Sequence, residues 1–187
     1  MQGQETGNAV ADVVFGRVNP GGKLPVSIAR SVGQLPIFYN HKPTARRGYL
    51  FDTTQPLYPF GYGLSYTTFS LSAPRLAQTS IRADQPVKVS VDVANTGTRA
   101  GDEVVQLYVH QQVASVTRPV IELKRFKRVH LEPGVRTTVE FELEPDDLTL
   151  WNLQMKRVVE PGVFDVYAGP NSVDLKKTEL TVTPALK

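Results

Sequence analysis

The sequence predicts a mainly β fold, an immunoglobulin-like β-sandwich preceded by a short partial α/β segment. From residue 66 onward, short runs of alternating apolar and polar residues recur, and the four valines between Val87 and Val93 alternate strictly. Turn sequences such as Glu132-Pro133-Gly134 separate the runs. Seven runs within about 115 residues fit the size of an immunoglobulin-like sandwich.

Each expected strand is a run of period two bounded by turn residues. Since alternate side chains point to opposite faces, the glutamates between 140 and 144 should lie on a solvated face. Tyr108 and Trp151 are candidate core rings, and Asp146-Asp147-Leu148 should form a short helical turn. The expected strands are Thr68–Arg75, Val87–Asn95, Glu103–Gln111, Val120–Leu123 with Lys127–Leu131, Arg136–Leu143, Gly162–Ala168 and Leu175–Val182.

One helix is expected before the sandwich, over Gly7–Phe15. Thr6 or Asn8 could cap its start, and Gly16 stands where a terminal glycine would end it. Lys23–Ala29 follows as an edge strand or extended segment, because its proline argues against a central strand. Two to three helical turns are not stable alone in water, so the helix needs a partner surface.

The stretch Pro56–Phe69 separates an irregular region rich in Gly and Pro from the predicted strands. Its aromatic rings provide more apolar surface than a free linker needs, so we interpret it as a buried connector between two bodies. The chain is therefore divided into residues 1–36 as a partial α/β segment, 37–65 as an ordered linker and 66–187 as the sandwich.

The composition excludes several classes of function. The 187 residues carry a formal charge of +3, and the basic residues are spread out apart from Arg46-Arg47 and Lys124–Arg128. The second cluster is interpreted as a strand with one wet face, with an acidic partner as the alternative. We expect no nucleic-acid binding from it. There are no cysteines, and the three histidines are far apart, so no metal site and no cofactor is expected. No apolar run approaches the length of a membrane span.

The N-terminal residues contain no signal-peptide pattern, which leaves the compartment open. The chain also leads almost at once into a helix without a preceding strand to pack on, which suggests part of a larger fold.

Several motifs, in order along nearly the whole chain, resemble family 3 glycoside hydrolases of the β-glucosidase type. The first two resemble the end of their α/β-sandwich domain, the third the junction after it, and the rest their C-terminal fibronectin type III-like domain. The motifs are Gly3–Gly16, Asn19–Pro25, Pro56–Phe69, Asn95-Thr96-Gly97, Gly101–Tyr108, Arg118–Phe126 and Glu160–Tyr167.

The resemblance implies a non-catalytic role for this chain. In that family an aspartate nucleophile comes from an N-terminal barrel and the acid/base glutamate from an earlier part of the α/β domain, and neither has a counterpart here. Glu5 matches a glutamate at the start of a later helix instead. A retaining glycosidase needs two carboxyl groups about 5 Å apart. The expected function is therefore to pack against and stabilise the catalytic domains, with no glycoside hydrolysis by the chain alone.

Two alternatives remain open at this stage. The first is a carbohydrate- or protein-binding module, because sugars stack on exposed aromatic rings. Its candidate substrate-binding residues are Tyr39, Arg46, Arg47, Tyr49, Asp52 and Tyr58. The second is a stand-alone hydrolase of esters or glycosides, with Ser65 as nucleophile and His41 not far away in sequence. Ser65 lacks the glycine that completes a nucleophile elbow, so a turn position fits it better.

The expected partners follow from these hypotheses. They are the remaining catalytic domains of a parent enzyme, an oligosaccharide, or a second copy of the chain that meets the first through the N-terminal segment. The resemblance also implies a periplasmic or secreted parent, since enzymes of this family are often found there.

Overall fold

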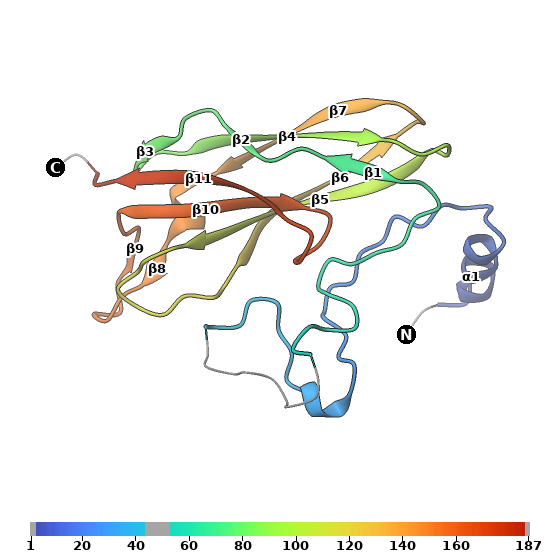
Figure 1. Ribbon diagram of the computed structural model, residues 1–187, viewed down its shortest axis with the longest axis horizontal. Helices are drawn as coiled ribbons and strands as arrows, with labels where there is room; N and C mark the ends of the chain where they lie inside the picture. The colour runs from blue at the N-terminus through green and yellow to red at the C-terminus, as the bar shows by residue number, and fades with distance from the viewer. Residues whose placement is uncertain (1–2, 44–52, 186–187) are drawn as a thin grey trace.

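The computed structural model describes residues 3–43 and 53–185, and within them the chain forms a β-sandwich with an N-terminal segment docked on one side (Figure 1). One α-helix, α1, spans Thr6–Val14, and two 3-10 helices, η1 and η2, span Val32–Gln34 and Pro145–Leu148. The strands are β1 Phe69–Leu71, β2 Arg75–Leu76, β3 Ser80–Arg82, β4 Val87–Asn95, β5 Gly101–Gln111, β6 Glu122–Leu131, β7 Arg136–Leu143, β8 Leu150–Trp151, β9 Arg157–Val158, β10 Gly162–Gly169 and β11 Lys176–Thr183.

Two sheets build the sandwich. In the first, β4 pairs with β7 along one edge and with the short strands β1 and β2 along the other. The second has the order β3-β11-β10-β5-β6, and its strands are antiparallel except for the parallel pair β3 and β11. A small hairpin, β8–β9, lies at the end of the sandwich opposite α1 (Figure 1).

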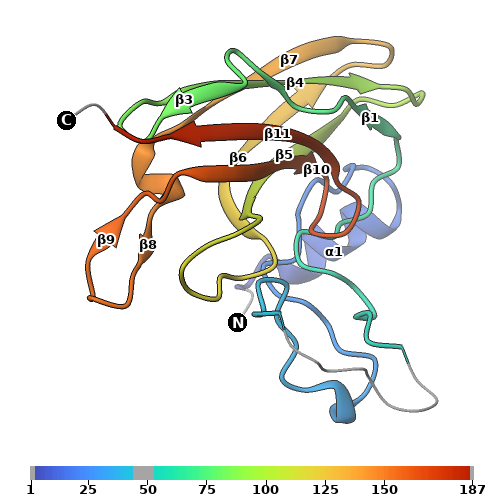
Figure 2. The same cartoon turned by 60° about the vertical axis from the view of Figure 1, so that its left-hand side comes forward.

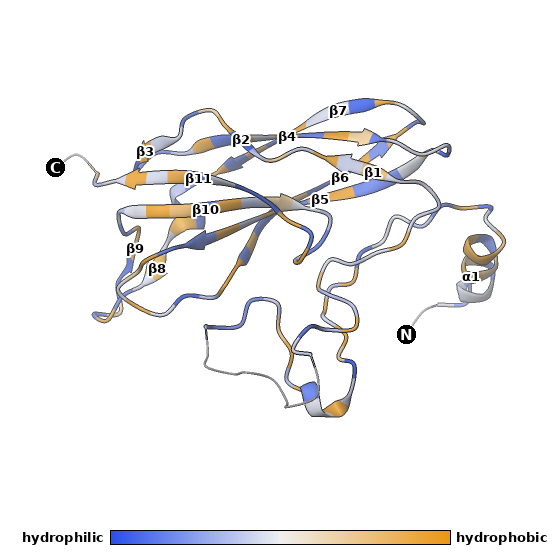
Figure 3. Ribbon diagram, in the orientation of Figure 1, coloured by the Kyte–Doolittle hydropathy of each residue, from blue (hydrophilic) through white to orange (hydrophobic). Residues whose placement is uncertain are grey.

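The core lies between the two sheets and follows directly from the alternation in the sequence. Along β4 the inward residues are fully buried while their neighbours are not, which Figure 3 shows as alternating colours on the strands. Each fully buried aliphatic side chain contributes about 1.5–3 kcal/mol relative to exposure. The fully buried aliphatic and aromatic residues of the core cluster include Val89, Val91, Val93, Val105, Leu107, Val109, Leu143, Phe164, Val166 and Leu180.

The structure confirms the predicted fold class and most of the strands. The bounds of β4 and β7 agree with the expected ones. The two runs expected around residues 120–131 form one continuous strand, β6, whose register shifts at a bulge. Three very short strands, β3, β8 and β9, were not expected, because two or three residues are too few to show a period.

Two expected core rings have different outcomes. Tyr108 is fully buried, as predicted, but Trp151 is 60% exposed, so its assignment to the core is wrong. Trp151 belongs to the β8–β9 hairpin, where only its neighbour Leu150 turns inward. The expected helical turn is η2, in which Asp147 accepts a hydrogen bond from the Glu144 amide at 2.9 Å.

The predicted helix is present, but its start differs. Glu5 is at the N-cap position without a capping side-chain hydrogen bond, so capping by Thr6 or Asn8 is wrong. The end is as expected, because Gly16 has φ of +72°, a conformation that glycine adopts without a Cβ penalty. No residue of α1 is buried.

The predicted extended segment after the helix pairs with the connector rather than with the sandwich sheets. The Leu24 amide donates to Tyr62 O and the Ile28 amide to Tyr58 O, both at 2.8 Å. These bonds tie residues 24–28 to residues 57–62 as a two-stranded ribbon that runs beneath the five-stranded sheet (Figure 2).

Candidate functional site: the docked N-terminal segment

The N-terminal segment, residues 3–43 with 53–66, is fixed to the sandwich by buried polar contacts. Asn19 Nδ2 donates to Ala100 O at 3.0 Å, while its Oδ1 accepts from Ser65 Oγ at 3.0 Å and from the Tyr66 amide at 2.8 Å. One side chain therefore joins the helix-to-ribbon turn, the connector and the start of β5.

A second polar side chain holds Thr67, the residue that follows the segment, at the first strands of the sandwich. Asn95, 1% exposed, accepts from Thr67 Oγ1 at 2.8 Å and donates to Arg99 O and Leu131 O at 2.7 and 2.9 Å. A buried amide with all its bonds made fixes local geometry, because losing any of them leaves a desolvated polar group.

The third contact holds the connector on the outer face of β5. Gln106, 3% exposed, donates to Gly61 O at 3.2 Å and to Pro170 O at 2.6 Å, and accepts from the Tyr108 hydroxyl at 2.5 Å. Gly61 has φ of +79°, and a Cβ there would lie 2.1 Å from Gln106 Oε1. Only glycine fits this approach.

An ion pair and an aromatic stack complete the docking. Lys23 Nζ lies 2.7 Å from Glu103 Oε1, and both side chains are largely buried. Tyr39 stacks on Phe60 with ring centroids 4.1 Å apart and meets Tyr108 edge-on at 5.9 Å. Burial raises the pKa of the Tyr39 hydroxyl, which accepts a hydrogen bond from the Leu123 amide.

The same segment also exposes many apolar side chains. Figure 3 shows the hydrophobic residues of α1 in orange. Among the described residues, Phe15 is 80% exposed, Leu64 70% and Val14 66%. Single exposed apolar residues are ordinary, but contiguous sets mark interaction sites. The exposed apolar strip, which we define by its members, comprises Val10, Val14, Phe15, Val18, Val26, Ile28, Leu57, Tyr58, Leu64 and Tyr66.

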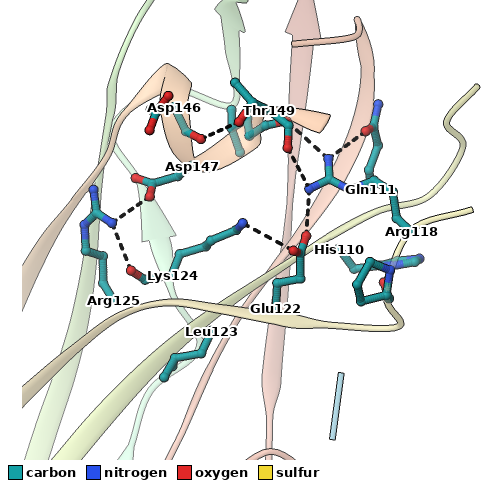
Figure 4. A network of polar contacts seen from close by, with 12 residues as sticks. His110, Gln111, Arg118, Glu122, Leu123, Lys124, Arg125, Asp146, Asp147 and Thr149 are labelled. Carbon is teal, nitrogen blue, oxygen red and sulfur yellow. Dashed lines mark hydrogen bonds and ion pairs between the residues drawn. The ribbon is translucent and has the colours of Figure 1, made fainter. Parts of the chain in front are cut away.

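A buried arginine fixes the connection between β5 and β6, as Figure 4 shows. Arg118, 8% exposed, donates to Gln111 Oε1 at 2.9 Å, to Glu122 Oε2 at 2.7 Å and to the carbonyls of Leu148 and Thr149. These bonds join the loop to β5, β6 and η2, so Arg118 acts as a clamp on this loop.

A cleft of about 740 Å³ lies between the N-terminal segment and the sandwich. Phe38, Tyr39 and His41 line one side, and Val120, Tyr167 and Val173 the other. The Val120 amide donates to His41 O at 2.9 Å, which fixes one rim to the loop clamped by Arg118.

Two of the six residues proposed for sugar binding, Tyr39 and Tyr58, lie within the described residues, and only the first lines the cleft. Tyr39 lines the cleft, but one ring face is covered by Phe60, and Tyr58 is 41% exposed beside Tyr62 and outside the cleft lining. The remaining candidates, Arg46, Arg47, Tyr49 and Asp52, lie outside the described residues.

Ser65 makes contacts typical of a turn residue. Its hydroxyl donates to the Asn19 amide oxygen and accepts from the Thr67 amide at 3.3 Å. The Nδ1 atom of His41 contacts Lys42 O instead. Asn19, Lys23 and Gln106 lie within motifs of the family resemblance, but the sequence did not predict their role, because a polar anchor has no periodic signal.

Within residues 3–43 and 53–185, no three His, Asp or Glu side chains lie close enough together to hold a metal ion. No helix there is both long and apolar enough to cross a membrane.

These features define a class of protein, a β-sandwich module that carries a rigidly docked segment with an exposed apolar strip. The models of two known domain families match the chain. The Glycosyl hydrolase family 3 C-terminal domain matches residues 1–66, and the Fibronectin type III-like domain matches residues 103–172. The chain belongs to glycosyl hydrolase family 3 and corresponds to the non-catalytic C-terminal portion of its β-glucosidases.

Individual relatives agree with this assignment. The chain is 46% identical to a periplasmic β-glucosidase of Salmonella typhimurium over 186 residues, a match that covers 94% of the chain. It is 50% identical to a β-xylosidase of Formosa agariphila over 186 residues, a match that covers 96% of the chain. It matches the solved β-glucosidases of Erythrobacter marinus and Listeria innocua with TM-scores of 0.91 and 0.92, at 49% and 37% identity, over 95% and 98% of its length.

The chain spans only about a quarter of these relatives, 24% and 26% of the two sequences and 24% and 27% of the two structures. It therefore corresponds to a domain of a larger enzyme.

Proposed function

We propose that this chain covers apolar surface on the catalytic domains of a β-glucosidase-type enzyme and holds their geometry. The observation that carries the proposal is that the N-terminal segment is fixed to the sandwich and yet exposes many apolar side chains. It is bound to the sandwich through Asn19, Lys23 and Gln106, and it also carries the exposed apolar strip. A segment that is held rigidly and exposes apolar side chains is suited to an interdomain contact.

The expected stabilisation has a simple physical origin. Removing apolar area from water contributes about 25 cal/mol per Å². Since the polar anchors already fix the segment to the sandwich, its backbone loses little further freedom when the partner covers the strip. The domain division given above, residues 1–36, 37–65 and 66–187, belongs to this proposal, with the first two ranges as the docking part.

Co-expression tests the proposal. The tagged chain is produced together with the Salmonella typhimurium β-glucosidase shortened by the quarter that this chain matches. We expect the two polypeptides to copurify. Val14→Asp, which places a charge in the strip, should abolish copurification. Leu153→Asp is the matched control, because Leu153 is equally exposed on the β8–β9 hairpin.

Failure of the unaltered pair to copurify would contradict the proposal. An equal loss of copurification with Val14→Asp and with Leu153→Asp would also contradict it, since the contact would then not be specific to the strip.

In the isolated chain, the same strip should meet a second copy. We propose that the purified chain forms homo-oligomers through the N-terminal segment. Sedimentation should show a dimer or larger species that Val14→Asp converts to monomer. A monomeric unaltered chain would contradict this.

A second candidate function is suggested by the cleft. Its exposed Phe38 ring, 60% exposed, stands near polar groups of Ser27 and His41, a combination suited to an oligosaccharide. Calorimetric titration with cellotetraose should show saturable heat that Phe38→Ala removes and Trp151→Ala leaves intact. Absence of saturable heat in the unaltered chain would exclude this function.

A further inference from the structure

An exposed phenylalanine on β6 lies outside the strip just described. Phe126 is 68% exposed, in the middle of the basic cluster. Its register partner on β5 is Gln106. Because directly paired residues point to the same face of a sheet, Phe126 lies on the outer face that the connector covers at Gln106 and Tyr108.

The N-terminal segment touches this edge of the sheet on both sides of Phe126. Toward one end, Tyr39 accepts from the Leu123 amide at 3.3 Å. Toward the other, Gly21 lies against Asp102 and Arg128, where a Cβ on the glycine would come within 2.8 Å of Asp102 Cβ. Phe126 therefore occupies an uncovered gap that continues the surface of the docked segment.

Three of the four cationic side chains of the basic cluster are already paired within the chain. Arg128 binds Asp102, Arg125 Nη1 lies 2.6 Å from Asp147 Oδ1, and Lys124 Nζ lies 3.6 Å from Glu122 Oε1. An acidic partner would have to break these pairs. The surface that covers Phe126 should therefore be apolar at its centre and without strong net charge.

The edge of β6 also argues against addition of a further strand. Lys127 is in register with the fully buried Val105, so its side chain leaves the strand on the core side and ends in solvent. An inward-pointing lysine on an edge strand blocks pairing with another strand. The partner therefore contacts the face, where Phe126 projects.

We propose that Phe126 is a direct anchor of the sandwich on the catalytic domains, inserted into an apolar depression of theirs beside the docked N-terminal segment. The inference rests on the proposed function and adds a second contact to it, made by the sandwich itself. An aromatic anchor surrounded by satisfied polar pairs has the arrangement of an interface hot spot.

The test uses the copurifying pair described above. Truncation of a buried aromatic anchor weakens binding by on the order of 10- to 100-fold, so Phe126→Ala should raise the dissociation constant by that factor. Phe126→Leu should restore part of the affinity. Trp151→Ala is the matched control, an aromatic residue of similar exposure at the far end of the sandwich, and should change nothing.

The outcomes distinguish the two proposals. If the unaltered pair does not associate, the proposed function fails. If it associates and Phe126→Ala binds as tightly as the unaltered chain, only the anchor is overturned. Equal weakening by Phe126→Ala and Trp151→Ala also overturns it. The thermal midpoint of the isolated Phe126→Ala chain should equal that of the unaltered chain, because the ring is exposed there, and a lower midpoint would indicate a structural role instead.

Discussion

At the scale of single residues, a few polar side chains determine how the N-terminal segment lies on the sandwich. Gln106 is the most connected of them at the connector, because it binds Gly61, Pro170 and Tyr108 together. Apolar burial gives the sandwich its stability, whereas these directional bonds give the docking its geometry.

Replacing Gln106 by alanine should destabilise the chain by about 1–3 kcal/mol, since buried acceptors and the Tyr108 hydroxyl lose their partner. Urea denaturation measures this free energy. Gln154→Ala is the control, an exposed glutamine in the β8–β9 hairpin, and should be neutral. A neutral effect of Gln106→Ala would show that the connector is held by other contacts.

Stability should also depend on His130 in a pH-dependent way. Its hydrogen bond to Asp102, with Nδ1 2.7 Å from Oδ1, raises the pKa of the imidazole above its usual value. Arg128 shares the same carboxylate and Glu132 lies 3.6 Å from Nε2. The contribution of the charged histidine is therefore complete below its ordinary pKa and is lost as the pH rises through the raised one.

The measurement is the difference in thermal midpoint between the unaltered chain and His130→Ala. It should be larger near about pH 6 than near about pH 9, on either side of the raised pKa. A difference that is constant, or that grows with pH, would contradict the assignment of His130 as the titrating partner of Asp102.

At the scale of elements, the sequence of the exposed edge strand β6 decides whether that edge of the sheet stays unpaired. Replacing Lys127 by valine would continue the apolar side of β6 and remove the charge that keeps the edge unpaired. We expect light scattering to show concentration-dependent association of Lys127→Val beyond that of the unaltered chain. Lys88→Val, on the outer face of the central strand β4, should remain as the unaltered chain. Equal association of both variants would indicate general stickiness rather than edge pairing.

The elements also show how far the sequence alone leads. The bounds of β4 and β7 follow from their alternation, because each has one buried face. Trp151 was misplaced because a large ring suggests burial, although the hairpin that carries it is short and stands away from the core. The apolar residues of the docked segment could be recognised, but which of its sides faces the sandwich depends on Asn19, Lys23 and Gln106, whose partners are 40 or more residues distant in the chain.

At the scale of the whole molecule, the described part of the chain presents exposed apolar surface. Phe126 lies on the outer face of the five-stranded sheet, the face on which the N-terminal segment is docked at Gln106. The family assignment gives this surface a context, since the matched relatives are about four times as long as the chain.

The most direct test is β-glucosidase activity of the co-expressed pair against each polypeptide alone, with 4-nitrophenyl β-glucoside as substrate. We predict turnover by the pair, none by this chain alone, and a shorter half-life of activity at elevated temperature when the chain is omitted or carries Val14→Asp. Turnover by the purified chain alone, or a shortened enzyme that is equally active and durable without it, would contradict the account.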